Sequence, residues 1–326
     1  MSKFIPEVTS AYIQIKNLRL HYLSSQSQLF SLKQPLQTIV FLHGFPEHSG
    51  VWRRQLSYFA NEFRAIALDL PGYNLSQAPS SLHEFSVPNL VSVIAEFIKI
   101  ICQDSPTVLV AHDWGGALAW PLASRFPELI DKLVIINAAH PSTFTREMID
   151  NQNQRILSDY IHDFLESNAE DQLSSDDFAA LKAHSIDKFR VHLSVEEIAA
   201  YERAWSRPNS ITSMLNYYRA MPQLFPRENP VPEALNRAAG AVETPERPLN
   251  EIKKPNIRIS MPTLVLWGDN DQAFDVQVLD GLSEYIDDYT ECRFADASHW
   301  LHHEKPDEVN QTIAAFLKAK KGKGSV

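Results

Sequence analysis

The residue that suggests chemistry first is Asp113, in the stretch VLVAHDWGGALAW (residues 108–120), where a strand-forming run meets a helix-forming run. Small residues stand two positions before it and two after it, Ala111 and Gly115, which is the condition for a sharp strand-to-helix turn that exposes a nucleophile. A carboxylate there could attack an sp³ carbon and give an ester that water can cleave, whereas a serine would give an ether. An aspartate that only caps the helix is the alternative interpretation.

A second segment, FLHGFPEHSGVW, follows another apolar run and contains a candidate oxyanion donor. In enzymes with a nucleophile at such a turn, one backbone N–H follows the nucleophile and the other comes from an earlier loop after a strand. The N–H groups of Trp114 and Phe45 occupy these two places. Gly44 would allow a close approach of the backbone and Pro46 would fix the loop, although a plain tight turn explains the same residues.

Two later loops supply an acid and a base. LWGDND contains Asp269 and Asp271, and ASHW contains His299. The chain order nucleophile, acid, histidine is the order expected for the α/β-hydrolase fold. His299, His302 and His303 could also share a helix face as metal ligands, but no Cys pair or second His-rich segment accompanies them. We therefore expect neither a metal nor a cofactor.

The segments around these residues predict an α/β architecture. Five short runs rich in Val, Ile and Leu are typical of strands buried on both faces: LQTIVFL, FRAIALDL, PTVLVAH, LIDKLVIIN and MPTLVLW. Amphipathic stretches alternate with them, so we expect a mostly parallel sheet flanked by helices. AYIQIKNLRLHYL (residues 11–23) predicts one further strand and YTECRFADASH a last one, whereas Pro121 predicts either a kink or tight packing of its helix.

The strand pattern stops after Asn137. Residues 140–221 are helical in composition, and residues 222–262 contain eight prolines before the strand pattern resumes. Such a stretch is too long for a strand–helix connection. We therefore predict one α/β-hydrolase core (residues 1–138 and 251–326) interrupted by a helical cap with a Pro-rich return segment (residues 139–250).

The composition limits the class of protein. The chain has 326 residues, of which 44% are hydrophobic and 21% charged, with a net charge of −10. This acidic balance argues against a nucleic-acid partner, and the basic run at residues 318–323 predicts a solvated tail. Cys102 and Cys292 are far apart, which predicts free thiols in a reducing compartment. No segment has the length of a signal peptide or a membrane span, so we expect a cytoplasmic protein, with a homodimer left open.

The chain resembles the epoxide hydrolase branch of the α/β-hydrolase superfamily, whose relatives include haloalkane and fluoroacetate dehalogenases. The similarity extends through HGFPEHSGVWRRQ, DLPGYNLS, AHDWGG, LNYYRA, GDND and SHW, in this order. It implies that Asp113 is the nucleophile and His299 the base. It also implies that Asp271, the last residue of a G-x-x-D loop, is the orienting acid, with Asp269 as the alternative.

The same resemblance implies two cap tyrosines that stabilise the leaving oxygen of an epoxide. One is Tyr218, in LNYYRA. The other is Tyr160, because DYIHDFLESNAE contains the family's Y-x-x-x-F pattern, although Ser167-Asn168 replace the usual proline-glycine pair. His162 is the alternative partner, since some members of the branch use a histidine with the tyrosine, and core packing is an alternative role for Tyr160.

We therefore predict hydrolysis of small hydrophobic epoxides to vicinal diols by water, through an alkyl-aspartate ester. A haloalkane or haloacid dehalogenase is the alternative, but Phe45 replaces a halide-binding asparagine and Trp114 replaces a carboxylate-binding arginine. A non-catalytic ligand-binding protein is a further alternative, although every catalytic position holds a competent residue. A serine esterase is not expected, since no serine stands at the turn. The substrate is expected between cap and core, lined by Phe45, Trp114, Trp300 and His162.

Overall fold

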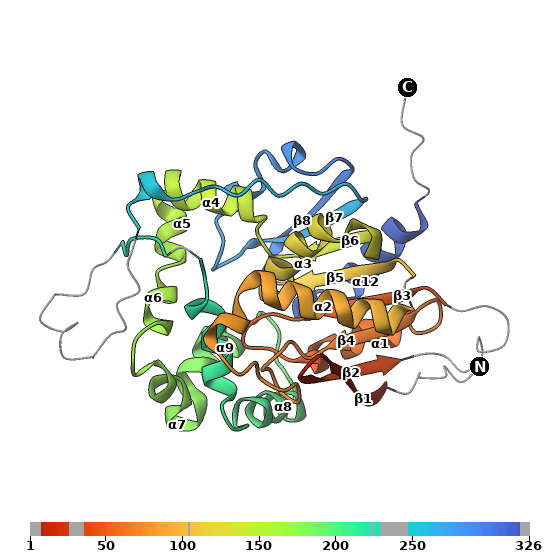
Figure 1. The fold of residues 1–326 in the computed structure, drawn as a ribbon, viewed down its shortest axis with the longest axis horizontal. Helices are drawn as coiled ribbons and strands as arrows, with labels where there is room; N and C mark the ends of the chain where they lie inside the picture. Colours follow the sequence, from red (N-terminus) through yellow and green to blue (C-terminus); the bar gives the residue numbers. More distant parts are fainter. Residues whose placement is uncertain (1–7, 26–35, 104, 223, 229–246, 320–326) are drawn as a thin grey trace, which may run out of the picture.

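A single eight-stranded sheet organises the computed structural model, which describes residues 8–25, 36–103, 105–222, 224–228 and 247–319 (Figure 1). Its strand order is β1-β2-β4-β3-β5-β6-β7-β8, with β3 to β8 parallel and β1 and β2 antiparallel. The strands are β1 (Val8–Ile15), β2 (Leu18–Ser25), β3 (Thr38–Leu42), β4 (Arg64–Leu68), β5 (Thr107–His112), β6 (Ile130–Ile136), β7 (Thr263–Asn270) and β8 (Tyr289–Ser298).

The prediction of one strand over residues 11–23 was wrong. The segment forms the β1–β2 hairpin, in which Ile15 pairs with Leu18 across a two-residue turn. Lys16 makes this turn possible by adopting a left-handed conformation, with φ of 52°. The alternation of apolar residues continues across the turn, so the pattern alone gives no sign of the reversal.

Helices cover both faces of the sheet, as the apolar runs predict. In β3, Val40 and Leu42 pack in the apolar cluster that contains the α2 and α3 side chains, whereas Ile39 and Phe41 pack in the cluster of α1 and α12. These helices are α1 (Arg53–Phe59), α2 (Val87–Cys102), α3 (Trp114–Arg125) and α12 (Pro306–Lys318), and a short α11 (Leu301–Glu304) follows β8. Helix α3 continues through Pro121 and ends at Arg125.

The described residues between β6 and β7 form six helices: α4 (Pro141–Asp150), α5 (Gln152–Leu157), α6 (Tyr160–Phe164), α7 (Ala169–His184), α8 (Val195–Trp205) and α9 (Ser210–Arg219). Figure 1 shows these inserted helices gathered at one side of the sheet. Residues 175–178 interrupt α7 with non-helical backbone. In the predicted Pro-rich return segment, residues 223 and 229–246 lie outside the described residues, as does most of the basic tail, residues 320–326.

Short 3₁₀ turns complete the described chain: η2 (Ser49–Trp52), η3 (Leu82–Phe85), η4 (Pro127–Leu129), η5 (Ile186–Lys188), η6 (Leu249–Glu251), η7 (Val276–Leu279) and η8 (Leu282–Glu284). Within the described ranges, no helix has both the length and the apolar character needed to cross a membrane. Both cysteines are free thiols.

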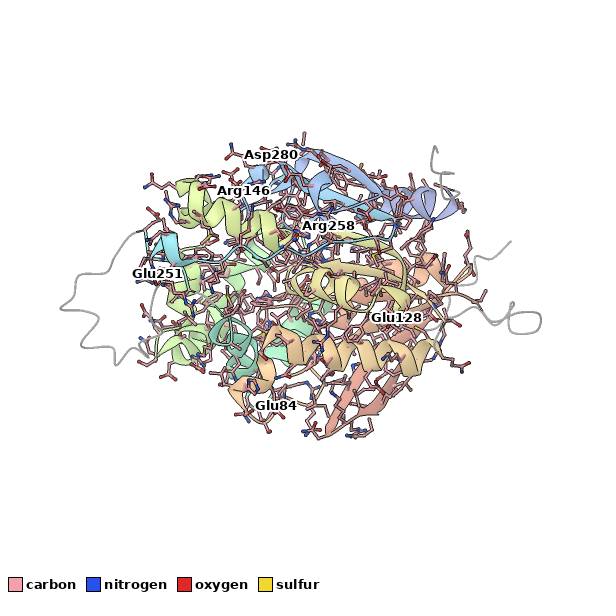
Figure 2. All side chains as sticks on the ribbon, turned by 45° about the horizontal axis from the view of Figure 1, so that its top comes forward. Glu84, Glu128, Arg146, Glu251, Arg258 and Asp280 are labelled. Atoms are coloured by element: carbon pink, nitrogen blue, oxygen red, sulfur yellow. The ribbon has the colours of Figure 1, made fainter. Side chains whose placement is uncertain are left out.

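Hydrogen bonds fasten the inserted helices to the core. Arg146 of α4 donates to the carbonyl oxygens of Gln277 (2.9 Å) and Asp280 (2.8 Å), and Figure 2 shows Arg146 beside Asp280 at the surface. The indole N–H of Trp205 donates to the carbonyl of Pro46 (2.7 Å). Since Pro46 follows the predicted oxyanion residue Phe45, this bond ties α8 directly to the loop that contacts the site.

Candidate active site

The backbone at Asp113 has the strained form of a nucleophile turn. Its φ and ψ are 49° and −121°, a conformation that residues with a Cβ rarely adopt and that occurs mainly at functional positions. A Cβ on Gly115 would lie 2.5 Å from the carbonyl oxygen of Leu42, so the turn requires glycine there. The capping alternative fails, because the Asp113 side chain accepts no capping hydrogen bond from α3.

The Asp113 carboxylate accepts a short hydrogen bond from the loop after β3. The N–H of Phe45 donates to Oδ1 at 2.6 Å. Gly44 permits this approach, because a Cβ at Gly44 would lie 2.3 Å from the Cβ of Asp113. The other carboxylate oxygen, Oδ2, lies 3.7 Å from Nε2 of His299. Burial alone would raise the pKa of Asp113, but His299 and the Phe45 N–H outweigh it and hold this pKa below its usual value.

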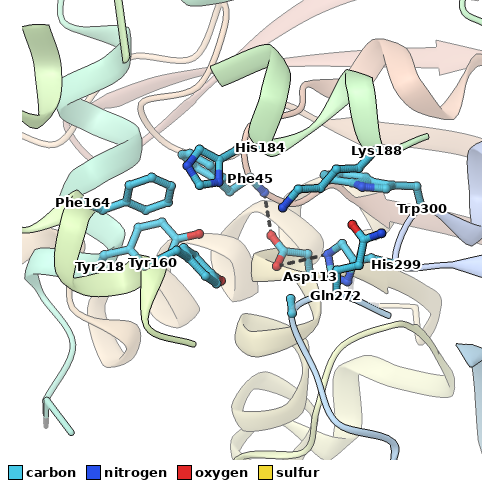
Figure 3. Close-up of a pocket in the computed structure, with 11 residues that line it drawn as sticks. Phe45, Asp113, Tyr160, Phe164, His184, Lys188, Tyr218, Gln272, His299 and Trp300 are labelled. Carbon is cyan, nitrogen blue, oxygen red and sulfur yellow. Dashed lines mark hydrogen bonds and ion pairs between the residues drawn. The ribbon is translucent and has the colours of Figure 1, made fainter. Parts of the chain in front are cut away.

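His299 lies between two carboxylates. Its Nδ1 is 2.8 Å from Oδ2 of Asp271. Burial by itself would lower the pKa of His299, but the charge of Asp271 and the contact with Asp113 outweigh burial and raise it to about 10. The imidazole is therefore a cation at neutral pH in the free enzyme, with one carboxylate on each nitrogen. Figure 3 shows the contact with Asp113.

Asp271, and not Asp269, is the acid beside His299. The backbone N–H groups of Ala273 and Phe274 donate to Oδ1 of Asp271 (2.7 and 3.0 Å), and its side chain is 1% exposed. Asp269 instead accepts a hydrogen bond from Arg293 at 2.8 Å. The side-chain amide of Asn137, which sequence reasoning missed, donates to Oδ2 of Asp271 at 2.7 Å. Three donors thus fix the orientation of this carboxylate.

The inserted helices bring two tyrosines to Asp113. Tyr160 begins α6 and Tyr218 lies in α9, and both line the same cavities as Asp113. Figure 3 shows both phenols on one side of the carboxylate. The Tyr218 ring packs edge-on against Phe45 and Trp114, with centroid distances of 5.4 and 5.2 Å. Burial, helped by the charge of Asp113, raises the pKa of both phenols well above the usual value, so both remain protonated donors.

His162 does not join this pair, because it lines neither cavity beside Asp113. Its place in α6 explains the difference. Tyr160 and Phe164 are four residues apart and share a helix face, whereas His162 is two residues from each and points elsewhere. A different histidine, His184 at the end of α7, lies near the Phe164 ring with a centroid distance of 5.2 Å.

Two cavities meet at Asp113, Tyr160 and Tyr218. The larger has a volume of about 310 Å³ and a mostly apolar lining that includes Trp114, which was predicted there. The smaller has a volume of about 50 Å³, and the predicted residues Phe45 and Trp300 line it. Sequence reasoning missed the other residues of its wall: Phe164, His184, Lys188, Gln272 and Ala273.

A second group of carboxylate and histidines lies behind the turn. Glu47 is within hydrogen-bond distance of Nδ1 of His112 (3.1 Å) and Nε2 of both His302 (3.2 Å) and His303 (2.7 Å). The Tyr201 hydroxyl donates to it at 3.2 Å. The ligand atoms of Glu47, His112 and His302 lie within 4.8 Å of one another, a spacing that a cation could bridge. Hydrogen bonds between the same atoms account for that spacing without one.

Comparison with known proteins places the chain in a family. The family model described as alpha/beta hydrolase fold matches residues 37–306. The chain is 32% identical to human epoxide hydrolase 4 over 320 residues, covering 95% of this chain and 79% of that protein. It belongs to the epoxide hydrolase branch of the α/β-hydrolase superfamily. A variant of an epoxide hydrolase from Bacillus megaterium superposes with a TM-score of 0.79 at 34% identity, over 95% of this chain and all of that one.

Proposed function

We propose that the protein hydrolyses epoxides to vicinal diols through an ester between Asp113 and the substrate. The observation on which this rests is that one carboxylate and two buried, protonated phenols line the same cavity. A nucleophile opposite paired acids is the arrangement that opening of an epoxide ring requires, because an alkoxide is a poor leaving group without a donor.

In the first step, Oδ2 of Asp113 attacks a ring carbon and the bond between that carbon and the epoxide oxygen breaks. The leaving oxygen takes up negative charge and receives hydrogen bonds, and then a proton, from Tyr218 and Tyr160. Oδ2 suits this attack because its contact with His299 Nε2, at 3.7 Å, is longer than a hydrogen bond. The Phe45 N–H meanwhile holds the other oxygen, Oδ1.

In the second step, His299 takes a proton from water, and the resulting hydroxide attacks the carbonyl carbon of the Asp113 ester. Charge then develops on Oδ1, which already faces the Phe45 N–H and which the predicted Trp114 N–H would also stabilise. Such donors contribute roughly 3–4 kcal/mol in other hydrolases. Collapse of the intermediate releases the diol and regenerates the carboxylate.

Formation of the ester also prepares the base. In the free enzyme, His299 is held protonated by the carboxylates of Asp271 and Asp113. Esterification removes the negative charge of Asp113, so one of the two groups that raise the pKa of His299 is lost. The imidazolium can then pass its proton to the tyrosinate that the first step leaves, which restores the phenol, and the neutral ring can act on water, which the cation could not do.

We further propose that residues 139–250 form the cap and that the substrate's apolar part occupies the larger cavity. The reaction needs only the epoxide and water, and none of these steps uses a cofactor or a metal. A cytoplasmic location remains part of this proposal; the acidic composition and the two free thiols support it.

A single turnover in ¹⁸O-labelled water tests the mechanism. With enzyme in excess over styrene oxide, we expect an unlabelled diol, and mass spectrometry of the peptide that contains Asp113 should show one ¹⁸O. Asp113→Asn, freshly purified, serves as the control and should form neither product. Label in the first diol would mean direct attack by water and would refute the ester.

A parallel assay separates this function from dehalogenation. Phe45 packs against Phe164 (5.1 Å between centroids) and Tyr218 and offers no side-chain donor to a halide. We therefore expect diol from styrene oxide to form much faster than bromide from 1-bromohexane. Release of bromide without any diol would instead favour the dehalogenase alternative, and neither product would favour a binding protein.

A further inference from the structure

The small cavity has a cationic side chain in its wall. Lys188, at the end of η5, lines it together with Asp113 and Gln272. Figure 3 shows the Lys188 side chain extending across the site with its ammonium group toward Asp113, and the Gln272 amide on the same side. Among the described residues, none is in hydrogen-bond or ion-pair contact with the ammonium group of Lys188, whereas the ammonium of Lys182, six residues earlier, is paired with Glu202 at 2.6 Å.

The two cavities differ in chemistry. The larger one is lined mainly by apolar side chains such as Phe144, Ile161 and Phe274, and suits a hydrocarbon group. The smaller one adds an ammonium, a primary amide and the imidazole of His184 to the catalytic groups. Half-burial lowers the pKa of Lys188, although the charge of Asp271 partly opposes this effect. The lowered pKa reflects the cost of keeping the charged ammonium of Lys188 without a close partner. A substrate bearing a negative charge would supply that partner.

The charge balance permits such a substrate. Asp113 and Asp271 contribute two negative charges, and protonated His299 and Lys188 contribute two positive ones, so the four groups sum to zero. Without Lys188 the site would carry a net negative charge and would repel an anion. The volume of about 50 Å³ limits the anion to a small group, such as a carboxylate.

We propose that Lys188 and Gln272 form a subsite for a carboxylate, and that the enzyme prefers epoxides with a carboxylate next to the ring and an apolar group on the other ring carbon. The ammonium of Lys188 would bind one carboxylate oxygen and the Gln272 amide the other. The apolar group would enter the larger cavity, with the ring at Asp113. This substrate class rests on the proposed function.

Two substrates of one shape test the subsite: trans-3-phenylglycidate, which is an anion, and trans-3-phenylglycidamide, which is neutral. In Lys188→Met we expect kcat/KM for the glycidate to fall about tenfold to hundredfold, the range for a hydrogen bond to a charged group. For the amide we expect a change of less than about threefold. Lys188→Arg should retain most of the preference for the anion, and Lys182→Met should behave as wild type on both substrates.

Two results would overturn the subsite. An equal loss on both substrates in Lys188→Met would show that Lys188 acts on Asp113 and not on the substrate. No loss on either would show a solvated lysine at the cavity mouth. Circular dichroism of each variant would separate these outcomes from misfolding.

Binding of the unreactive analogue trans-cinnamate, measured by calorimetry against trans-cinnamamide, tests the subsite without catalysis. We expect cinnamate to bind more tightly to wild type, and Lys188→Met to lose this difference; equal binding of the two in wild type would refute the subsite. If wild type hydrolysed none of the three epoxides (the glycidate, the glycidamide and styrene oxide), the proposed function would be refuted. The calorimetry would still test the carboxylate subsite in that case.

Discussion

Asp113 and Glu47 are both carboxylates with histidine partners: His299 for Asp113, and His112, His302 and His303 for Glu47. The two groups meet in the sequence, because His112 directly precedes Asp113. Glu47 is fully buried and accepts contacts from three histidines and Tyr201. The Asp113 side chain is 12% exposed, receives one short hydrogen bond, and faces two cavities. The same residue types therefore serve structure in one place and suit chemistry in the other.

The number of donors explains the difference. Burial alone would raise the pKa of Glu47, but the charge of His302 and hydrogen bonds from His112, His302 and His303 outweigh it and hold the pKa well below the usual value. A carboxylate with every lone pair engaged is a poor nucleophile and has no path to a substrate. Oδ2 of Asp113 has no short hydrogen bond among the described residues, so this oxygen is available for the proposed attack.

Replacing the proposed nucleophile should have the largest effect on activity. We expect Asp113→Asn to lower kcat for styrene oxide by about 10⁶-fold, as removal of the nucleophile does in other hydrolases. The melting temperature at neutral pH should fall by no more than a few degrees, because the side chain accepts one hydrogen bond and each unit by which the pKa of His299 falls costs about 1.4 kcal/mol. Mass spectrometry of the fresh variant would exclude deamidation back to aspartate. Residual activity above a tenth of wild type would contradict the role of Asp113.

The tyrosine pair should have the next largest effect. We expect Tyr218→Phe to lower kcat/KM for epoxides by about 10²-fold, the lower range for loss of an acid catalyst, and to leave any release of bromide from bromoalkanes nearly unchanged. The adjacent Tyr217 is a matched control, because its hydroxyl donates to the Pro71 carbonyl (2.8 Å). Tyr217→Phe should reduce stability by about 1 kcal/mol with little change in rate. Equal losses on both substrate classes would assign Tyr218 to packing.

Glu47 should show the opposite phenotype to Asp113. In Glu47→Gln one oxygen becomes an amide group that cannot accept from the histidines, and we expect the free energy of unfolding to fall by about 2–3 kcal/mol, because a buried charged partner is removed. The rate for the remaining folded protein should stay within about tenfold of wild type. Denaturant melts together with single-turnover rates measure both. A large loss of rate with unchanged stability would place Glu47 in the chemistry.

Local sequence patterns predicted the parts of the site that lie at the ends of strands. Asp113, Phe45 and His299 each follow a β-rich run in a short motif, so their neighbours in sequence also position them in space. The order of the motifs gave the fold class, and the Y-x-x-x-F spacing placed Tyr160 on one helix face with Phe164. His162 could have been set aside by the same spacing, since residues two apart do not share a face.

Other residues gave no local signal because only tertiary packing brings them to the site. Asn137 directly follows β6 and contacts Asp271 across 134 residues of chain. Lys188 and His184 lie in a polar, helix-forming segment, at the ends of η5 and α7. Several charged residues of this segment could equally have faced the cavity, so the sequence alone does not single out these two. Glu47 was visible in HGFPEH, but its histidine partners come from β5 and α11, so its role required the folded arrangement.

The smallest expected effect is a change in the pKa of His299 of about one unit or more. It tests the electrostatic coupling between His299 and the carboxylate of Asp113, which has no counterpart at Glu47. Asp113→Asn removes the same negative charge that ester formation removes, so it mimics the alkylated enzyme electrostatically. We expect the pKa of His299 to fall below the value of about 10 in wild type, because Asp271 alone then opposes burial. Nuclear magnetic resonance titration of the ring nitrogens, assigned with His299→Gln, measures it, and an unchanged pKa would refute the coupling.

This coupling also fixes the sign of the pH dependence. The folded-state pKa of His299 lies above the unfolded value of about 6.5. Protonated His299 therefore stabilises the fold fully below pH 6.5, and this contribution is lost as the pH rises toward 10. In Asp113→Asn the loss of this stabilisation should be smaller and should be complete at a lower pH.

The two reaction steps should differ in their pH dependence. In wild type, the rate of ester formation should be constant from pH 6 to 9, because Asp113 is ionised throughout. Ester hydrolysis should rise over that range as His299 loses its proton, and pre-steady-state rates at each pH would separate the two steps.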